Sequence, residues 1–211
     1  MSVPDAAYYA RVAAWSGTPR YATEVRALLA RLDLPDGARV LDLGCGTGTA
    51  IRFLEARGCQ PIGLDRPAAW MAACEAQTRV RADGVALPFP PRSFDAVLLV
   101  HVLSHLDDPP RCLSEAHRVL RPGGRIGLLS PNALFLTALR LSRRGDPAYV
   151  PDPTVQRHYT LSHARRMLRR AGFEIETAVR IGDQPLPVPV PLTRERLLLI
   201  GRRRGACLGA R

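Results

Sequence analysis

The segment from Val40 to Gly48 constrains the fold more than any other part of the chain. An apolar run ends at Asp42, and the glycines Gly44, Gly46 and Gly48 then alternate with single residues before a helical pattern begins. This order predicts a strand, a tight turn and a helix. A ligand can lie against a glycine backbone because no Cβ blocks its approach, and the amides that open the next helix point into the same space. The segment therefore predicts the floor of a nucleotide-type cofactor site.

The pattern on both sides of this turn predicts an α/β fold. Strands are expected at residues 38–43, 60–65, 79–82, 95–100 and 125–129, with a turn at 121–124. Helices are expected at residues 49–57, 67–77 and 109–120, so the order alternates and predicts a parallel sheet covered on both faces. After a helix at 162–170, strands at 173–181 and 196–202 are joined by a proline-rich loop without a helix, which predicts an antiparallel pair at the sheet edge.

Two segments fall outside this alternation. Residues 1–34 predict two N-terminal helices, the clearer one at 22–34, and residues 131–160 contain a helical pattern at 132–142 followed by a polar, proline-containing stretch. Long irregular segments in a compact domain are usually functional or disordered. We therefore expect residues 131–160 to form a substrate lid within a single domain of residues 1–211.

Composition limits the classes of protein that fit. The chain has 211 residues, of which 46% are hydrophobic, and no apolar run approaches the ~20 residues of a membrane span. The five cysteines show neither metal-ligand spacing nor pairing, which predicts reduced thiols in the cytoplasm. The acids and histidines likewise lack the spacing of a metal site.

The net charge of +11 leaves a second class of function open. Every basic residue is an arginine, and arginines gather at 165–170 and 202–204. Such charge favours acidic partners, so an RNA-binding or RNA-modifying protein is an alternative. Aromatic residues make up only 6% of the chain and do not alternate with these arginines, so we expect nucleic-acid binding to be weak and salt-dependent.

Acidic residues end two further strands of the predicted sheet. Asp65 ends the second strand and Asp83 follows the third. In open α/β sheets ligands bind beyond the carboxyl ends of the strands, where Asp65 could accept hydrogen bonds from a ribose and Asp83 could meet an adenine. A lone aspartate after a strand is usually a helix cap, so the evidence is the joint placement of these acids with the glycine turn.

A nicotinamide-dependent dehydrogenase is the closest competitor among nucleotide-binding folds. Its fingerprint is G-x-G-x-x-G, whereas the third glycine here comes one residue early, at Gly48. Asp42 also precedes the first glycine, where it would repel a pyrophosphate but could hold a cationic amino group. Both departures argue against a dinucleotide.

The ordered motifs resemble those of a known family. The sequence VLDLGCGTG at residues 40–48 resembles the first motif of class I S-adenosylmethionine-dependent methyltransferases, and GLD at 63–65 is similar to their second. DGVALPF at 83–89 resembles the adenine-contacting segment of the small-molecule subgroup that contains ubiquinone/menaquinone-biosynthesis enzymes. The series continues with SFD (93–95), HL (105–106), RVLRPGG (118–124), YT (159–160) and AGF (171–173).

This resemblance implies a Rossmann-like, seven-stranded, mostly parallel sheet with the last strand antiparallel, and S-adenosylmethionine as the cofactor. Asp42 would lie near the amino group of the cofactor, Asp65 near its ribose and Asp83 near its adenine. The implied cofactor-binding residues are Asp42, Gly44, Cys45, Gly46, Thr47, Gly48, Asp65, Arg66, Asp83, Gly84, Val85 and His101.

The resemblance also implies methyl transfer to a small-molecule acceptor. Many amino- and base-directed relatives carry Asn/Asp-Pro-Pro-Tyr after the fourth strand, whereas this chain has HVLS at 101–104. A hydroxyl or an activated carbon is therefore the favoured target. Such an acceptor benefits from a base, and His101 and His105 are the candidate catalytic residues because they follow the central strand.

Overall fold

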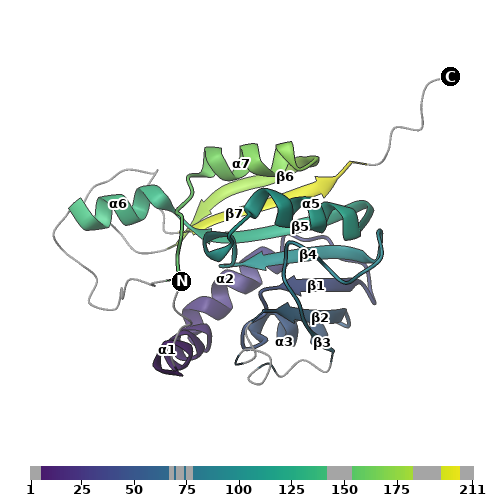
Figure 1. Ribbon diagram of the computed structural model, residues 1–211, viewed down its shortest axis with the longest axis horizontal. Helices are drawn as coiled ribbons and strands as arrows, with labels where there is room; N and C mark the ends of the chain where they lie inside the picture. The colour runs from purple at the N-terminus through teal and green to yellow at the C-terminus, as the bar shows by residue number, and fades with distance from the viewer. Residues whose placement is uncertain are drawn as a thin grey trace.

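The computed structural model describes residues 6–66, 69, 74, 78–141, 154–182 and 196–204, and its strands form one seven-stranded sheet (Figure 1). The strands are β1 (Arg39–Leu43), β2 (Gln60–Asp65), β3 (Arg79–Arg81), β4 (Phe94–Val100), β5 (Leu120–Pro131), β6 (Phe173–Ile181) and β7 (Arg196–Arg203). The helices are α1 (Ala6–Ser16), α2 (Pro19–Leu29), α3 (Thr49–Glu55), η1 (Leu103–His105), α5 (Pro109–Val119), α6 (Ala133–Leu141) and α7 (Leu161–Arg170).

The strand order is β3-β2-β1-β4-β5-β7-β6. All pairs from β3 to β5 are parallel, whereas β7 runs antiparallel to both of its neighbours. This confirms the predicted Rossmann-like sheet and its reversed last strand. After β1 the chain adds β2 and β3 on one side of β1, and it then crosses to the other side to form β4. At such a reversal of strand order, the crevice for a ligand opens beyond the carboxyl ends of the two central strands, here β1 and β4.

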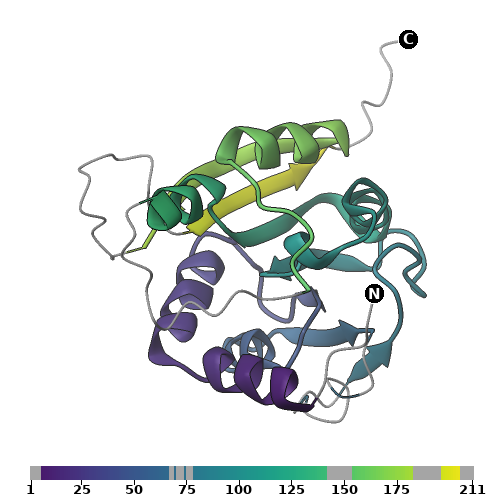
Figure 2. The same cartoon turned by 60° about the vertical axis from the view of Figure 1, so that its left-hand side comes forward.

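Helices cover both faces of the sheet because side chains alternate along each strand. In β4, Ala96, Leu98 and Val100 pack into the core beneath α2 and α3. Val97 and Leu99 point the other way, into the core beneath α5 and α7. Figures 1 and 2 show α2 and α7 on opposite sides of the sheet. This two-sided burial explains why β4 is an unbroken apolar run.

Helix α2 begins and ends earlier than the sequence pattern predicts. The side chain of Thr18 accepts a hydrogen bond from the Tyr21 amide and Pro19 occupies the first helical turn, so the helix starts at Pro19 instead of residue 22. At the other end, the guanidinium of Arg57 donates to the carbonyl oxygen of Leu29 (2.8 Å). Leu32 stays buried, but it lies in the connection to β1.

The turn predicted at residues 121–124 is wrong, because β5 runs without interruption from Leu120. Phe94 pairs with Leu120 and Ala96 with Arg125, so the extra residues form an irregularity within the strand. A Cβ on Gly124 would lie 2.9 Å from the carbonyl oxygen of Asp95. The glycines therefore allow β5 to bulge against β4 and continue.

The other predicted elements agree closely with the observed bounds wherever the structure describes them. The helix predicted at 67–77 lies almost entirely outside the described residues. The same holds for residues 142–153 of the predicted lid, so that the lid remains a prediction. Its described parts are α6, where Phe135 and Leu136 are buried and Leu134 is exposed, and residues 154–160.

Candidate functional site

The glycine turn after β1 adopts backbone angles that favour glycine. Gly44, Gly46 and Gly48 have φ values of 78°, 51° and 85°, all in the left-handed region. The amides of Gly44 and Cys45 both donate to the carbonyl oxygen of Leu64, at 2.7 and 3.1 Å. The turn is therefore fixed against the end of β2.

The glycines of the turn face different surroundings. A Cβ on Gly44 would lie 1.9 Å from Cγ2 of Val102, so the side chain of Val102 already fills that space. On the side where its Cβ would lie, Gly44 is therefore packed against protein, and its contact with a ligand stays a prediction. At Gly46, no described atom lies within 4 Å of the position that a Cβ would take. Gly46 thus presents an open side that a ligand can approach.

Asp42 precedes the turn and is 2% exposed. Its Oδ1 atom has no hydrogen-bond partner among the described residues. Burial, with a smaller contribution from the nearby charge of Asp65, raises the pKa of this carboxyl to about 7. A buried carboxylate oxygen without a partner costs free energy that a cationic ligand group would offset.

Asp65 lies at the end of β2, facing the same turn. Its Oδ2 accepts from the Gly46 amide (3.0 Å) and its Oδ1 from the Arg66 amide (2.8 Å). Burial raises the pKa of the Asp65 carboxyl, whereas these two amides lower it. Each carboxylate oxygen has a second lone pair, so both can still accept a bond from a ligand hydroxyl.

Asp83, Gly84 and Val85 follow β3 at the same end of the sheet. The Asp83 Oδ1 accepts from the Val85 amide (3.1 Å), which closes a tight turn, and Arg66 lies 3.6 Å from Oδ2. A Cβ on Gly84 would lie 3.1 Å from Cδ2 of Leu43. Gly84 is therefore needed for close packing on the end of β1, and this packing brings Asp83 to the predicted cofactor edge.

Helix α1 ends against the glycine turn. The hydroxyl of Ser16 lies 2.9 Å from that of Thr47, and the Thr49 hydroxyl donates to the Ser16 carbonyl oxygen (3.1 Å). On the other side of the turn, Sγ of Cys45 lies 3.7 Å from Sγ of Cys74. Thr47 and Cys45 thus support the turn through contacts with residues far away in the sequence.

His101 follows β4 and is held by contacts on several sides. It has a φ of 57°, and its Nε2 lies 3.0 Å from Oε2 of the buried Glu24. The rings of Trp15 and Tyr21 lie against its imidazole, with centroids 4.9 and 5.7 Å away. Burial lowers the pKa of His101, the hydrogen bond that its Nε2 donates to Glu24 opposes this, and the charge of Arg196 adds to the lowering.

His105 ends η1 and makes a different set of contacts. Its Nδ1 lies 2.7 Å from the hydroxyl of Thr154, which lies 2.9 Å from the hydroxyl of Tyr8. These contacts join α1, η1 and the segment that leads to α7. His105 thus connects three elements around the crevice, which favours a supporting role over proton transfer.

The sequence predicted the acids and glycines of this site but missed several of its other residues. Glu24, Ser16, Thr154 and Arg196 all contact predicted site residues or their neighbours. Glu24 had an available signal, because a charged residue lies on the apolar face of α2 between Tyr21 and Leu28. The other three are polar residues of common surface types without a distinguishing pattern.

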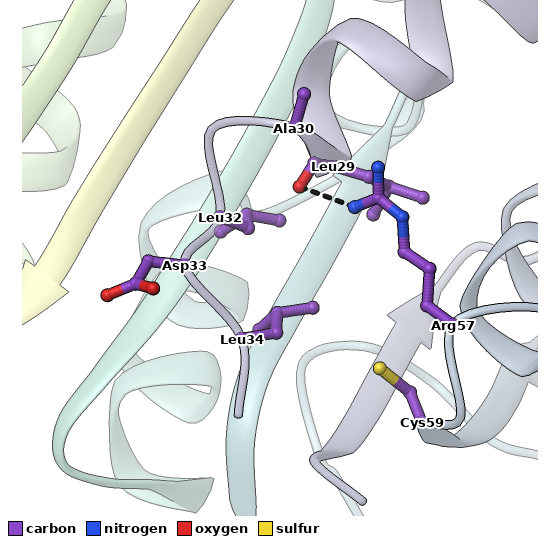
Figure 3. Close-up of a pocket in the computed structure, with 7 residues that line it drawn as sticks. All are labelled: Leu29, Ala30, Leu32, Asp33, Leu34, Arg57 and Cys59. Carbon is purple, nitrogen blue, oxygen red and sulfur yellow. Dashed lines mark hydrogen bonds between the residues drawn. The ribbon is translucent and has the colours of Figure 1, made fainter. Parts of the chain in front are cut away.

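Figure 3 shows an open hollow at the opposite end of the sheet, lined by Leu29, Ala30, Leu32, Asp33, Leu34, Arg57 and Cys59. The guanidinium of Arg57, which lines this hollow, already donates a hydrogen bond to the Leu29 carbonyl oxygen.

Among the described residues, no group of three or more His, Cys, Asp or Glu side chains is arranged to hold a metal ion. Nor does the described part of the chain contain a helix with the length and apolarity to cross a membrane.

Comparisons with known proteins agree with this geometry. A family model described as a methyltransferase domain matches residues 15–178. The O-methyltransferase resE of Aspergillus sclerotiorum is 31% identical over 199 residues, which cover 87% of this chain and 74% of that protein. The 2-phytyl-1,4-naphtoquinone methyltransferase of Thermosynechococcus vestitus is 38% identical over 108 residues, 46% of this chain and 48% of that protein. The matched segment thus spans about half the length of the latter relative.

Solved structures share the fold. A chain in the complex between the Haloferax volcanii Trm112 methyltransferase activator and the putative methyltransferase superposes with a TM-score of 0.76. That superposition covers 97% of this chain and 100% of the other, at 22% sequence identity. At this identity the likeness shows the fold alone.

Proposed function

The chain belongs to the class I S-adenosylmethionine-dependent methyltransferase family, and we propose that it transfers a methyl group to a hydroxyl or activated carbon of a small molecule. The observation that carries this proposal is the buried, unpartnered Oδ1 of Asp42, together with the open side of Gly46 in the turn that follows it. A neutral or anionic ligand would leave this carboxylate uncompensated. A ligand with a cationic amino group and a sulfonium fits it.

The residues around the turn supply the rest of the proposed cofactor site. Asp42 would hold the amino group, and the turn from Gly44 to Gly48, including Cys45 and Thr47, would lie along the methionine part. Asp65 would accept from the ribose hydroxyls. The adenine would lie near Arg66, Asp83, Gly84 and Val85, whose mutual contacts order that end of the crevice.

The cofactor supplies an activated methyl group on a sulfonium, with a neutral thioether as its leaving group. The protein then has to orient the acceptor and exclude water. His101 is the proposed base, because burial keeps its imidazole neutral near pH 7. His105, through Thr154, supports the wall of the acceptor site.

The nucleic-acid alternative is less well supported. Both curated relatives described above are named as methyltransferases, and one name specifies a quinone substrate. We therefore propose a small molecule as acceptor and attribute the charge of +11 to a solvated, arginine-rich surface. Cys45, Cys59, Cys74 and Cys112 are free thiols, which is compatible with the cytoplasmic location that we propose.

Calorimetry tests the proposed cofactor. S-adenosylmethionine and its demethylated product should bind in the micromolar range, and NAD should not bind. Asp65→Ala should weaken binding of the demethylated product by about tenfold or more, because it removes charge-assisted hydrogen bonds. Asp36→Ala, an exposed acid before β1, is the matched control and should leave affinity unchanged. Tight NAD binding without binding of S-adenosylmethionine would refute the proposal.

A labelled-methyl assay tests the proposed acceptor class. The protein is incubated with labelled S-adenosylmethionine and either 1,4-naphthohydroquinone or a metabolite extract of the host, and labelled products are identified by mass spectrometry. Label on an oxygen or carbon of a small molecule is expected. Label that accumulates only in RNA would contradict the small-molecule proposal.

A further inference from the structure

Glu24 lies at the centre of a buried polar cluster that joins three parts of the chain. It is 6% exposed and belongs to α2. Its Oε2 is 3.0 Å from Nε2 of His101 and 3.1 Å from Nε of Arg196, the first residue of β7. Arg20 approaches Oε1 from the solvent side at 3.5 Å. Hydrogen bonds from His101 and Arg196 offset the cost of burying this carboxylate, and they lower its pKa against the effect of burial.

The contact with Glu24 determines which nitrogen of His101 carries the proton. A carboxylate only accepts hydrogen bonds, so Nε2 donates and Nδ1 of the neutral ring keeps a lone pair. Nδ1 is buried and has no hydrogen-bond partner in the part of the chain that the structure describes. Nδ1 therefore keeps an unused lone pair, and it is the ring atom of the neutral imidazole that can accept a proton.

The backbone and the neighbouring rings hold His101 in place. Its φ of 57° is uncommon for a residue with a side chain and costs roughly 1–2 kcal/mol. The amide of His101 still donates to the carbonyl oxygen of Leu129 (2.8 Å), which extends the β4 ladder by one residue. Trp15 and Tyr21 pack on the ring. Strain of this kind persists where the surroundings impose it, and it concentrates at functional sites.

We propose that Glu24 is a positioning residue that orients His101 so that Nδ1 receives the proton of the methyl acceptor. This inference rests on the proposed methyl transfer. The O–H or C–H proton of the acceptor moves to Nδ1, and the electron pair left on oxygen or carbon forms the new bond to the methyl carbon. The pair of the broken carbon–sulfur bond stays on sulfur. The resulting imidazolium is stabilised by the carboxylate of Glu24 and later releases its proton to water.

Several charged groups face the imidazole. Glu24 on α2 stabilises the protonated ring, while Arg196 on β7 and His105 on η1 destabilise it. Burial also destabilises the protonated ring and is the largest effect, so the pKa of His101 lies below its usual value. Removing the charge of Glu24 should therefore lower the pKa of His101 further.

Nitrogen-15 NMR of the histidine side chains tests the proposal without any acceptor. In the wild-type protein, both free and with the demethylated cofactor bound, His101 should show a protonated Nε2 and an unprotonated Nδ1 at pH 7. In Glu24→Gln, the pKa of His101 should fall by about one unit or more. Arg20→Gln is the matched control, because it removes a charged group that approaches the other carboxylate oxygen of Glu24, Oε1, at 3.5 Å. A proton on Nδ1 in the wild-type protein would overturn the proposal, even if the variant failed to fold.

Turnover separates a positioning role from a purely structural one. On the acceptor that the labelled-methyl assay identifies, Glu24→Gln should reduce kcat by about tenfold or more while affinity for the demethylated cofactor stays within about threefold. The acid limb of the kcat profile should move to lower pH, and Glu24→Asp should recover part of the rate. An unchanged pH profile would contradict the proposal. If no acceptor is found, the proposed function loses support, whereas the NMR result still decides the tautomer.

Discussion

The two halves of the crevice are built in different ways. In the donor half, around the glycine turn, contacts join neighbouring strands, such as the Gly46 amide with Asp65 and the Gly44 amide with Leu64. In the acceptor half, contacts join distant parts of the chain: 77 positions separate Glu24 from His101, and 146 separate Tyr8 from Thr154. The donor half is thus specified mainly by the geometry of neighbouring strands and the turn, with Ser16 and Cys74 as supporting contacts from farther along the chain. The acceptor half exists only once the whole sheet has formed.

This difference predicts which half tolerates change. Backbone angles and close packing specify the donor half, so substitutions there should affect folding and cofactor binding together. Side chains on helices at the edge specify the acceptor half, so substitutions there should alter turnover while cofactor affinity persists. The three predictions below test this separation, beginning with the largest expected effect.

Substitution of Gly44 should be the most damaging. Gly44→Ala places a Cβ 1.9 Å from Val102 Cγ2 on a backbone with a φ of 78°. The left-handed backbone and overpacking together should lower the free energy of unfolding by about 2–4 kcal/mol, measured by urea denaturation. Val102→Ala removes the side chain that the new Cβ would meet. Adding Gly44→Ala to Val102→Ala should therefore lower the free energy of unfolding by less than Gly44→Ala does in the wild-type protein.

Gly46→Ala is the matched control for this experiment. It has a comparable backbone angle, with a φ of 51°, but no described atom lies near the added methyl group. Its stability loss should be limited to about 1–2 kcal/mol. Affinity for the demethylated cofactor should fall at least as far as for Asp65→Ala, because the methyl group fills the open side of the turn. Full affinity in Gly46→Ala would show that the donor half does not use this backbone.

The second prediction concerns the buried carboxyl of Asp42. Its pKa is raised from 3.8 to about 7 in the free protein, so the carboxyl is largely protonated below pH 7. A cationic ligand binds the ionised form, and cofactor affinity should therefore rise with pH and level off above about 7. Asp42→Asn should remove this pH dependence and weaken binding by about tenfold or more. Calorimetry from pH 5.5 to 8.5 measures both effects.

The raised pKa of Asp42 affects folding stability in the opposite direction from cofactor affinity: stability falls as the pH rises. Because the folded pKa lies above the unfolded value, the free folded protein binds more protons than the unfolded chain between the two pKa values. The contribution of Asp42 to stability is therefore fully present below about pH 4 and is lost as the pH rises through about 7. Asp42→Asn should flatten this part of the stability profile. A profile that does not differ between wild type and variant would contradict the raised pKa.

The contrast between the halves also explains what the sequence could predict. Gly44, Asp42 and Asp65 could be found because each one follows an apolar run that predicts its strand, and parallel strands end at a common edge. The contact of Glu24 with Arg196 could not be found, because it depends on where β7 enters the sheet. For the same reason His101 could be placed after β4, whereas its partner and tautomer could not be derived.

The smallest expected effect concerns the contact between α1 and the segment that precedes α7. Tyr8→Phe removes the hydroxyl that lies 2.9 Å from the Thr154 hydroxyl, which itself contacts His105. A single neutral hydrogen bond contributes about 0.5–1.5 kcal/mol, so the melting temperature should fall by only a few degrees. Because this contact lies in the acceptor half, affinity for the demethylated cofactor should stay within about twofold, and the KM of the acceptor should rise by about threefold to tenfold. A loss of cofactor affinity in Tyr8→Phe without a change in acceptor KM would mean that the two halves are coupled through α1, whose last residue, Ser16, contacts the glycine turn at Thr47.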